Sequence, residues 1–296
     1  VPCLERLLDV PAFEVAGVIS QPDKPAGRSM KLQSSPVKQL AVERGLPVLT
    51  PESARAPEVL EWIRGVRADS AVVVAYGQIL SRDFLALFKR PAVNVHASLL
   101  PRWRGAAPIQ RSIMAGDKVT GVALQVIVPK LDAGPLLGKR EILIDDETTS
   151  LDLYGVLKTR APELLEVEYL EYLRGLREPV AQDESQVTVA QKVTKEEGLI
   201  DWRMPAREIN QRIRGLWMWP GSWTIRGGKT LKIWKTRVLD GSGAAGSVVQ
   251  VTPGSFVVAC GSGRLEVSEV QPESRARMPV SEYLKGYPLS TGESFG

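Results

Sequence analysis

The single histidine of the chain, His96, is the residue best suited to move protons. It ends the apolar run 92–96, and Asn94 stands two positions before it. Side chains two positions apart in a strand project from the same face, so an imidazole and a carboxamide are expected side by side. A lone histidine is more often structural than catalytic, but this one is predicted at the carboxyl end of a buried strand, where α/β proteins bind ligands. A turn containing Pro and Gly, residues 98–105, follows directly.

Asp132 supplies a carboxylate beyond a second apolar run. It lies in the sequence Leu-Asp-Ala-Gly at 131–134, shortly after an apolar segment that ends at Val128. Asp before small residues is also common in ordinary turns. Beside His96, however, the carboxylate can orient the imidazole and stabilise its charged form. Asn94, His96 and Asp132 then suit acyl transfer, in which the amide donates to a developing oxyanion and the imidazole accepts and returns a proton.

The sequence predicts no covalent nucleophile. The one match to the pattern Gly-x-Ser-x-Gly is Gly292–Gly296, and no helix follows it to form the strand–turn–helix elbow that the motif requires. We interpret it as a chance match. The acyl group is therefore expected to pass directly to an external nucleophile.

The elements around these residues alternate between strands and helices. The segment 71–75 (Ala-Val-Val-Val-Ala) is apolar throughout, as in a strand buried on both faces. Further strands are predicted at 13–20, 92–96 and 121–128, and helices at 36–44 and 108–115. Strands separated by helices predict an α/β fold with a Rossmann-like, doubly wound, mostly parallel sheet.

The pattern changes after one long predicted helix at 149–176. Short strands split by Gly, Pro and Ser are expected in the C-terminal region, at 224–225, 230–238, 245–251, 255–260 and 264–270. They predict a small antiparallel, OB-like barrel or a sandwich. We therefore expect a catalytic domain at 1–176, a linker at 177–197 and a C-terminal domain at 198–296.

The chain opens almost directly with an amphipathic segment, residues 1–8. A parallel sheet of the predicted kind usually begins with a strand before such a helix. The first strand and its loop are therefore expected to be absent from this sequence.

Composition excludes several classes of protein. No apolar run approaches the ~20 residues needed to span a bilayer. Two distant cysteines, Cys3 and Cys260, do not make a disulfide framework, which favours a cytoplasmic location, and one histidine is too few for a His-based zinc site. The net charge of +4 is uneven: residues 190–296 hold 15 basic and 10 acidic side chains, against 23 and 24 before them. A basic C-terminal region points to a polyanionic partner or to a solvated basic surface.

The motif 94–109 (NVHASLLPRWRGAAPI), with Leu-Asp-Ala-Gly at 131–134 downstream, resembles the signature of the 10-formyltetrahydrofolate-dependent formyltransferases. The resemblance covers nearly the whole chain. It implies that Asn94, His96 and Asp132 are catalytic, that formyl comes from 10-formyltetrahydrofolate, and that no metal takes part. It also implies that the folate site includes a turn and a pterin loop, made of Ser98, Leu99, Leu100, Pro101, Tyr76, Gly77, Ile79 and Leu80. The family usually opens with a strand and a Gly-Thr-Pro loop, which this sequence lacks.

The loop 21–37 resembles the basic loop of the branch of this family that formylates methionyl initiator tRNA, and the resemblance implies tRNA contacts by Lys24, Arg28 and Lys31. The segment 209–239 agrees with this, because it has seven Lys or Arg, no Asp or Glu and four Trp. Basic residues mixed with aromatic ones suit a nucleic-acid surface, although tryptophans are more often core residues. Within this segment we expect tRNA contacts by Arg212, Arg214, Lys232 and Lys235.

Three alternative functions use parts of the same pattern. A sugar-nucleotide or purine-precursor formyltransferase would share the catalytic residues but would not explain the basic regions. An RNA-binding protein with a decayed core would not need the Asn/His/Asp set. A hydrolase that releases formate would turn over without an amine acceptor. We expect a monomeric, cytoplasmic enzyme with no membrane contact.

Overall fold

The computed structural model describes residues 1–26 and 30–296, and the chain divides into two compact units. The first unit holds residues 1–105, 121–142 and 156–189, and the second holds 106–120, 143–155 and 190–296. The predicted domain boundaries at 176/177 and 197/198 stay a prediction.

The main sheet of the first unit has the order β5-β6-β8-β9. Its strands are β5 (Val72–Val74), β6 (Val93–His96), β8 (Val119–Val126) and β9 (Leu136–Leu143). β5 and β6 are parallel, as predicted, but β8 runs antiparallel to β6, so the sheet is mixed. The expected crossover is absent because α5 (Pro108–Met114), between β6 and β8, belongs to the second unit and packs on its helix α8 (Ala206–Gly215).

The N-terminal part of the first unit is built around a separate parallel pair, β1 (Val18–Ile19) and β4 (Val48–Leu49). The strand predicted at 13–20 is shorter than expected because Phe13 instead stacks on Tyr169, with ring centroids 5.7 Å apart. The helices here are α1 (Pro2–Asp9), α2 (Pro36–Glu43), α3 (Pro57–Val66) and α4 (Arg82–Leu85). Ser35 caps α2 by accepting from the Lys38 amide, which explains why the predicted helix starts at Pro36.

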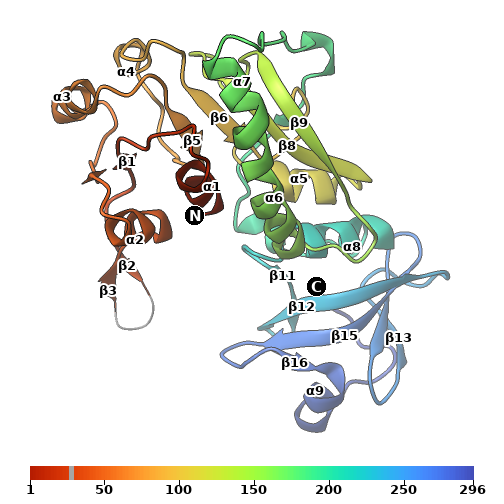
Figure 1. The fold of residues 1–296 in the computed structure, drawn as a ribbon. Helices are drawn as coiled ribbons and strands as arrows, with labels where there is room; N and C mark the ends of the chain where they lie inside the picture. The colour runs from red at the N-terminus through yellow and green to blue at the C-terminus, as the bar shows by residue number, and fades with distance from the viewer. Residues whose placement is uncertain (27–29) are drawn as a thin grey trace. The chain divides into compact units, whose positions relative to one another are not determined.

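The predicted long helix is confirmed as α6 (Ser150–Leu164), a π-helical turn (Leu165–Tyr169) and α7 (Leu170–Leu173). Its first-unit part lies across β8 and β9 (Figure 1). Glu168 in the π-helical turn is 6% exposed and pairs with Arg140 on β9 at 2.6 Å. The helix is thus joined to the sheet by a buried carboxylate as well as by apolar contacts.

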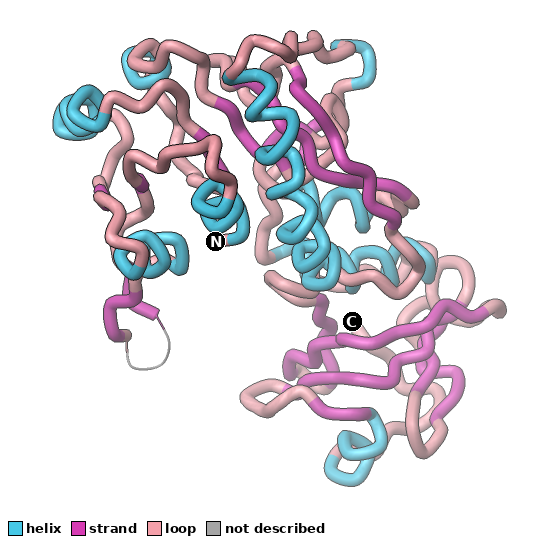
Figure 2. Tube along the Cα trace, in the orientation of Figure 1, coloured by secondary structure: helices cyan, strands magenta, loops and turns pink. Residues whose placement is uncertain are grey.

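The second unit is mostly antiparallel sheet, with order β11-β12-β15-β14-β13 and β16 paired to β15 (Figure 2). The elements that follow α8 are β11 (Ser222–Arg226), β12 (Lys229–Leu239), β13 (Val248–Val251), β14 (Phe256–Ala259), β15 (Arg264–Pro272), β16 (Met278–Pro279) and α9 (Val280–Gly286). All five predicted strands are found. Phe256, Ile233 and Leu265 are fully buried at the centre of the unit's core.

The C-terminal residues join the two edges of this sheet. The Gly292 amide donates to the carbonyl of Val248 on β13, and the Gly296 amide donates to the carbonyl of Ile225 on β11. The strand order itself is open, so this segment gives the sheet its barrel-like continuity. No helix in the described ranges 1–26 and 30–296 is both long and apolar enough to cross a membrane.

Candidate active site

Asn94 and His96 project from the same face of β6, as the sequence predicts. The His96 side chain is buried, and its Nε2 lies 2.9 Å from the carbonyl oxygen of Trp103. A carbonyl oxygen can only accept, so Nε2 carries the proton and donates it. The other ring nitrogen, Nδ1, faces Asp132, 3.7 Å from its Oδ2. Nδ1 is therefore the nitrogen that can take up a proton, next to a carboxylate that stabilises the resulting charge.

Asp132 is placed by the loop between β8 and β9. Its backbone is in the left-handed region, with φ 49°. Its carboxylate accepts from the Gly105 amide at 2.9 Å and from Gln125 Nε2 at 2.9 Å. These donors fix the carboxylate, while the Trp103 carbonyl orients the imidazole. From the sequence, we had predicted that Asp132 would orient the imidazole.

The Asn94 amide is half-buried on β6 and makes no side-chain hydrogen bond within the part of the chain that the structure describes. Its cross-strand partner is Gln125 of β8, on the same face of the sheet. A carboxamide without a partner beside His96 is available to donate to a substrate oxygen. The structure thus brings the three predicted catalytic residues to one end of the sheet.

The predicted folate turn is largely part of the core. Ser98 and Leu100 are fully buried, and Ser98 Oγ donates to the Arg102 carbonyl at 2.6 Å. Pro101 is buried and Leu99 half-buried. These residues fix the shape of the turn after β6, so a ligand can contact mainly its backbone.

The predicted pterin loop contains both buried and exposed side-chain groups. The Tyr76 hydroxyl is buried with no hydrogen-bond partner among the described residues, and burial raises the pKa of Tyr76. Ile79 is 72% exposed and Gly77 has φ 78°, whereas Leu80 packs in the core with Phe84. The loop thus offers both an unsatisfied hydroxyl, that of Tyr76, and an exposed apolar side chain, that of Ile79.

The basic loop forms a hairpin of β2 (Lys24–Ala26) and β3 (Lys31–Gln33), shown in Figure 1. Lys24 and Lys31 are exposed on it. At the base of the loop, Lys38 pairs with Asp23 at 2.8 Å, and this hydrogen bond lowers the pKa of Asp23. Arg28 lies outside the described residues.

The four predicted C-terminal cations have different environments. Lys235 is exposed, and the half-buried Lys232 donates to the Pro220 carbonyl at 3.2 Å. Arg212 is half-buried and donates to the Glu197 carbonyl. Arg214 is only 8% exposed and donates to the Thr148 carbonyl at 2.7 Å and to Asn210. Burial lowers the pKa of the Arg214 guanidinium, and we assign this residue to packing within the second unit.

Near Lys232, a cavity of about 490 Å³ opens in the second unit. It is lined by Trp219, which is 52% exposed, and also by Trp223 and Lys195. Trp217 and Trp234 instead contact each other and the guanidinium of Arg277, so two of the four tryptophans of this region are engaged within the unit.

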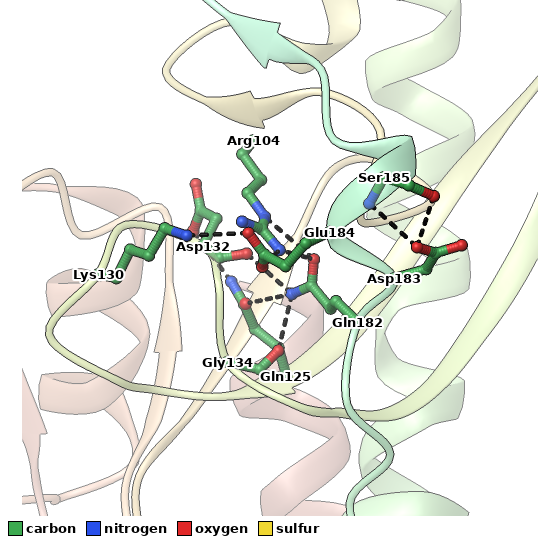
Figure 3. Close-up of polar contacts among 9 residues, drawn as sticks. All are labelled: Arg104, Gln125, Lys130, Asp132, Gly134, Gln182, Asp183, Glu184 and Ser185. Carbon is green, nitrogen blue, oxygen red and sulfur yellow. Dashed lines mark hydrogen bonds and ion pairs between the residues drawn. The ribbon is translucent and has the colours of Figure 1, made fainter.

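Sequence reasoning missed the polar residues that hold the catalytic ones (Figure 3). Gln125 was detectable, because it is the one polar side chain of the run 121–128. Arg104 lies within the recognised motif, but its burial to 5% exposure could not be read from it. Gln182 lies in a mixed polar segment that carries no local signal. In the described ranges, no group of three or more His, Cys, Asp or Glu side chains could hold a metal ion.

Residues 5–167 match the family model described as formyl transferase, and residues 192–288 match the model of its C-terminal domain. The chain belongs to the formyl transferase family.

Particular relatives are similar over nearly their full length. The chain is 47% identical to a methionyl-tRNA formyltransferase of Bdellovibrio bacteriovorus, covering 100% of this chain and 95% of the relative. It is 46% identical to a methionyl-tRNA formyltransferase of Magnetococcus marinus, covering 99% and 94%. Among solved structures, an N-formyltransferase of Helicobacter canadensis, in complex with folinic acid and dTDP-3-aminofucose, has a TM-score of 0.66 at 16% identity over 91% of this chain and 94% of that one. At that identity the likeness supports the fold alone.

Proposed function

We propose that this protein transfers the formyl group of 10-formyltetrahydrofolate to the α-amino group of methionyl initiator tRNA, giving N-formylmethionyl-tRNA for translation initiation. The observation that carries the chemistry is the placement of His96 Nδ1 beside Asp132, with Asn94 on the same strand face and its amide free of hydrogen-bond partners among the described residues. The choice of acceptor is supported by relatives of that name at 47% and 46% identity over nearly the whole chain.

The formyl donor supplies an activated one-carbon group, so the protein has to place an amine against it and handle charge and protons. A free α-amino group has an ordinary pKa of about 7.7–8.0, so part of it is neutral at cell pH. As the amine attacks, negative charge develops on the formyl oxygen, and the Asn94 N–H is the donor placed to stabilise it.

His96 handles the proton. Because Nε2 is held by the Trp103 carbonyl, Nδ1 accepts the proton that the attacking amine loses. Asp132 then faces a positively charged ring and favours that state. The same proton can be returned to the leaving nitrogen of the donor, which restores the starting state of the ring.

The folate site in this proposal comprises the turn Ser98–Pro101 and the loop with Tyr76, Gly77, Ile79 and Leu80. Support comes from the buried Tyr76 hydroxyl, which has no partner among the described residues and would bond to a polar edge of the pterin. The exposed Ile79 offers an apolar face for the ring. Ser98, Leu100 and Leu80 hold the backbone of these segments in place.

The tRNA surface in this proposal has two parts. The hairpin with Lys24 and Lys31 presents exposed cations, to which we add Arg28 of the same loop. In the second unit, Lys232 lines the cavity with Trp219, Lys235 lies on the same strand, β12, and Arg212 lies on α8. Lysines attract phosphates and an exposed tryptophan can stack on a base. Arg214 is left out, because its guanidinium is already used inside the unit.

The direct test measures transfer of labelled formyl from 10-formyltetrahydrofolate to methionyl initiator tRNA. Parallel reactions contain uncharged tRNA, a 3-amino sugar nucleotide, or no acceptor. We expect product only with the charged tRNA. Transfer to the sugar nucleotide, or formate release without an acceptor, would replace the proposal with one of the alternative functions.

The proposal includes a monomer that works in the cytoplasm and carries no metal. Size-exclusion chromatography with light scattering tests the first point: a single species near 32.4 kDa is expected. A concentration-dependent dimer would contradict it. Activity that survives treatment with a chelator is the expected result for the absence of a metal.

A further inference from the structure

A segment of the first unit, residues 182–188, crosses both loops that carry the catalytic machinery (Figure 3). At one end, Gln182 contacts the loop of Asp132. At the other, the Thr188 carbonyl accepts from the Arg104 amide and its hydroxyl accepts from the Trp103 amide, each at 2.9 Å. Trp103 is the residue whose carbonyl orients His96, so one segment bonds to both sides of the His96–Asp132 pair.

The Gln182 side chain uses its whole hydrogen-bonding capacity here. Its Nε2 donates to the Asp132 carbonyl at 2.9 Å and to the Gly134 carbonyl at 2.7 Å. Its Oε1 accepts from Arg104, from Nε at 3.1 Å and from Nη2 at 2.8 Å. A longer contact of 3.5 Å joins Nε2 to Oε1 of Gln125 on β8, so the amide has partners in the Asp132 loop, in β8 and in Arg104.

Arg104 is itself fixed. It is 5% exposed, and its Nη2 pairs with Glu184 at 2.7 Å. Glu184 also pairs with Lys130 of the Asp132 loop at 2.9 Å. The Asp132 loop is therefore linked to the segment 182–188 through Glu184 as well as through Gln182. Hydrogen bonds from Arg104 and Lys130 lower the pKa of Glu184 to about 2. The Glu184 carboxylate is therefore ionised at neutral pH.

We infer that Gln182, held by Arg104, is a positioning residue that sets the distance between the Asp132 carboxylate and His96 Nδ1. The Asp132 backbone is in the left-handed region, which a non-glycine residue occupies only when its surroundings hold it there. Gln182 bonds to the carbonyl of that same residue and to the carbonyl two positions on. Without these bonds the loop is free to relax, and the 3.7 Å approach of the carboxylate to Nδ1 changes.

The test compares three variants of the full chain. Gln182→Ala removes all five side-chain hydrogen bonds of this residue. Gln182→Glu keeps an acceptor for Arg104 but has no N–H for the two carbonyls or for Gln125. Gln186→Ala is the matched control, because Gln186 lies in the same segment and its side-chain amide bonds, among the described residues, to Asp183 alone. The inference rests on the proposed function, so formyl transfer to methionyl initiator tRNA is the first readout.

We expect kcat to fall on the order of 10- to 100-fold in Gln182→Ala, since a misplacement of about 1 Å has costs of this size. Gln182→Glu should lose a similar factor, and Gln186→Ala should match the wild type. The KM values for the folate and for the charged tRNA should stay within about two-fold in all three, because a residue that acts through the position of Asp132 changes the chemical step rather than substrate binding.

The second readout does not need activity. His96 is the only histidine, so the imidazole NMR signals belong to it without further assignment. They should move in both Gln182 variants and stay in place in Gln186→Ala. Unchanged kcat and unchanged His96 imidazole signals in Gln182→Ala would overturn the inference. Loss of folding in both Gln182 variants would also overturn it, because Gln182 would then be needed for stability. If the wild type transfers no formyl group, the proposed function fails, and the ring signals still decide on positioning.

Discussion

The catalytic centre of the first unit and the basic surface of the second unit differ in how far their side chains are hydrogen-bonded within the protein. At the centre, the polar side chains of Gln125, Gln182 and Arg104, which surround the Asp132 loop, all have hydrogen-bond partners inside the protein, at 2.7–3.1 Å. On the basic surface, Lys235 and Trp219 are exposed. Proton transfer requires atoms fixed within a fraction of an ångström, whereas attraction of a polyanion requires only charge at the surface.

This contrast predicts that single changes at the centre act on the chemical step, and that single changes on the surface act weakly on tRNA binding. The largest effect should follow Asp132→Asn. The variant keeps the size of the side chain but removes the charge that stabilises protonated His96. We expect kcat to fall on the order of 10²- to 10⁴-fold, measured by single-turnover formyl transfer. A loss of tRNA affinity that equals the loss of rate would show that Asp132 acts in binding.

The next largest effect is expected from Gly134→Ala. A β-carbon at this position would collide with the Val126 carbonyl of β8, which is backbone and cannot move aside. The Asp132 loop would be pushed from the sheet, so kcat should fall about 10- to 100-fold, with a loss of stability of about 1–3 kcal/mol. Rate measurements and denaturant unfolding test this. Gly286→Ala serves as the control, because a β-carbon there meets no atom within 4 Å.

Smaller effects are expected on the hairpin. Replacing both Lys24 and Lys31 by Ala should raise the KM for charged tRNA about three- to ten-fold and leave kcat with saturating tRNA near the wild-type value. The dependence of tRNA affinity on salt should also become shallower, because fewer counterions are released. An unchanged salt slope in filter-binding measurements would remove the hairpin from the tRNA surface.

The smallest effect concerns pH and Glu184. The folded pKa of Glu184, about 2, is below its ordinary value of 4.5. A depressed carboxyl pKa stabilises the folded state above the ordinary value, and this contribution is lost as pH falls through the folded pKa. Glu184→Gln should therefore lower Tm slightly at pH 7, and the difference from the wild type should shrink between pH 4.5 and 2. A constant difference over that range would show that Glu184 acts through packing.

The sequence predicted which candidate catalytic residues lie close together better than it predicted the residues that surround them. Asn94 and His96 share a strand, so period-two geometry placed them together, and a strand end placed Asp132 nearby. The direction of β8 was missed because helical spacing between strands says nothing about where that helix packs. Gln182 is 50 positions from the Asp132 carbonyl that it holds, and no local pattern encodes such a contact.

The charge pattern of the sequence also did not predict which basic side chains are exposed. Arg214 and Lys235 belong to the same basic stretch, yet Arg214 is 8% exposed and bonded to main-chain carbonyls, while Lys235 is exposed. Composition counts the charge of an arginine but does not reveal whether its donors are already used. The tryptophans show the same limit, because Trp234 contacts Trp217 and Arg277 whereas Trp219 is open.

The central claim is that Asn94 and His96 perform the chemistry on an amine that other parts of the protein bind. The most direct measurement is single-turnover formyl transfer by the wild type, Asn94→Ala and His96→Ala with methionyl initiator tRNA bound at saturation. The account predicts that both variants bind the charged tRNA like the wild type and form product at least about 100-fold more slowly. Product formation at the wild-type rate by either variant, with tRNA equally bound, would contradict it.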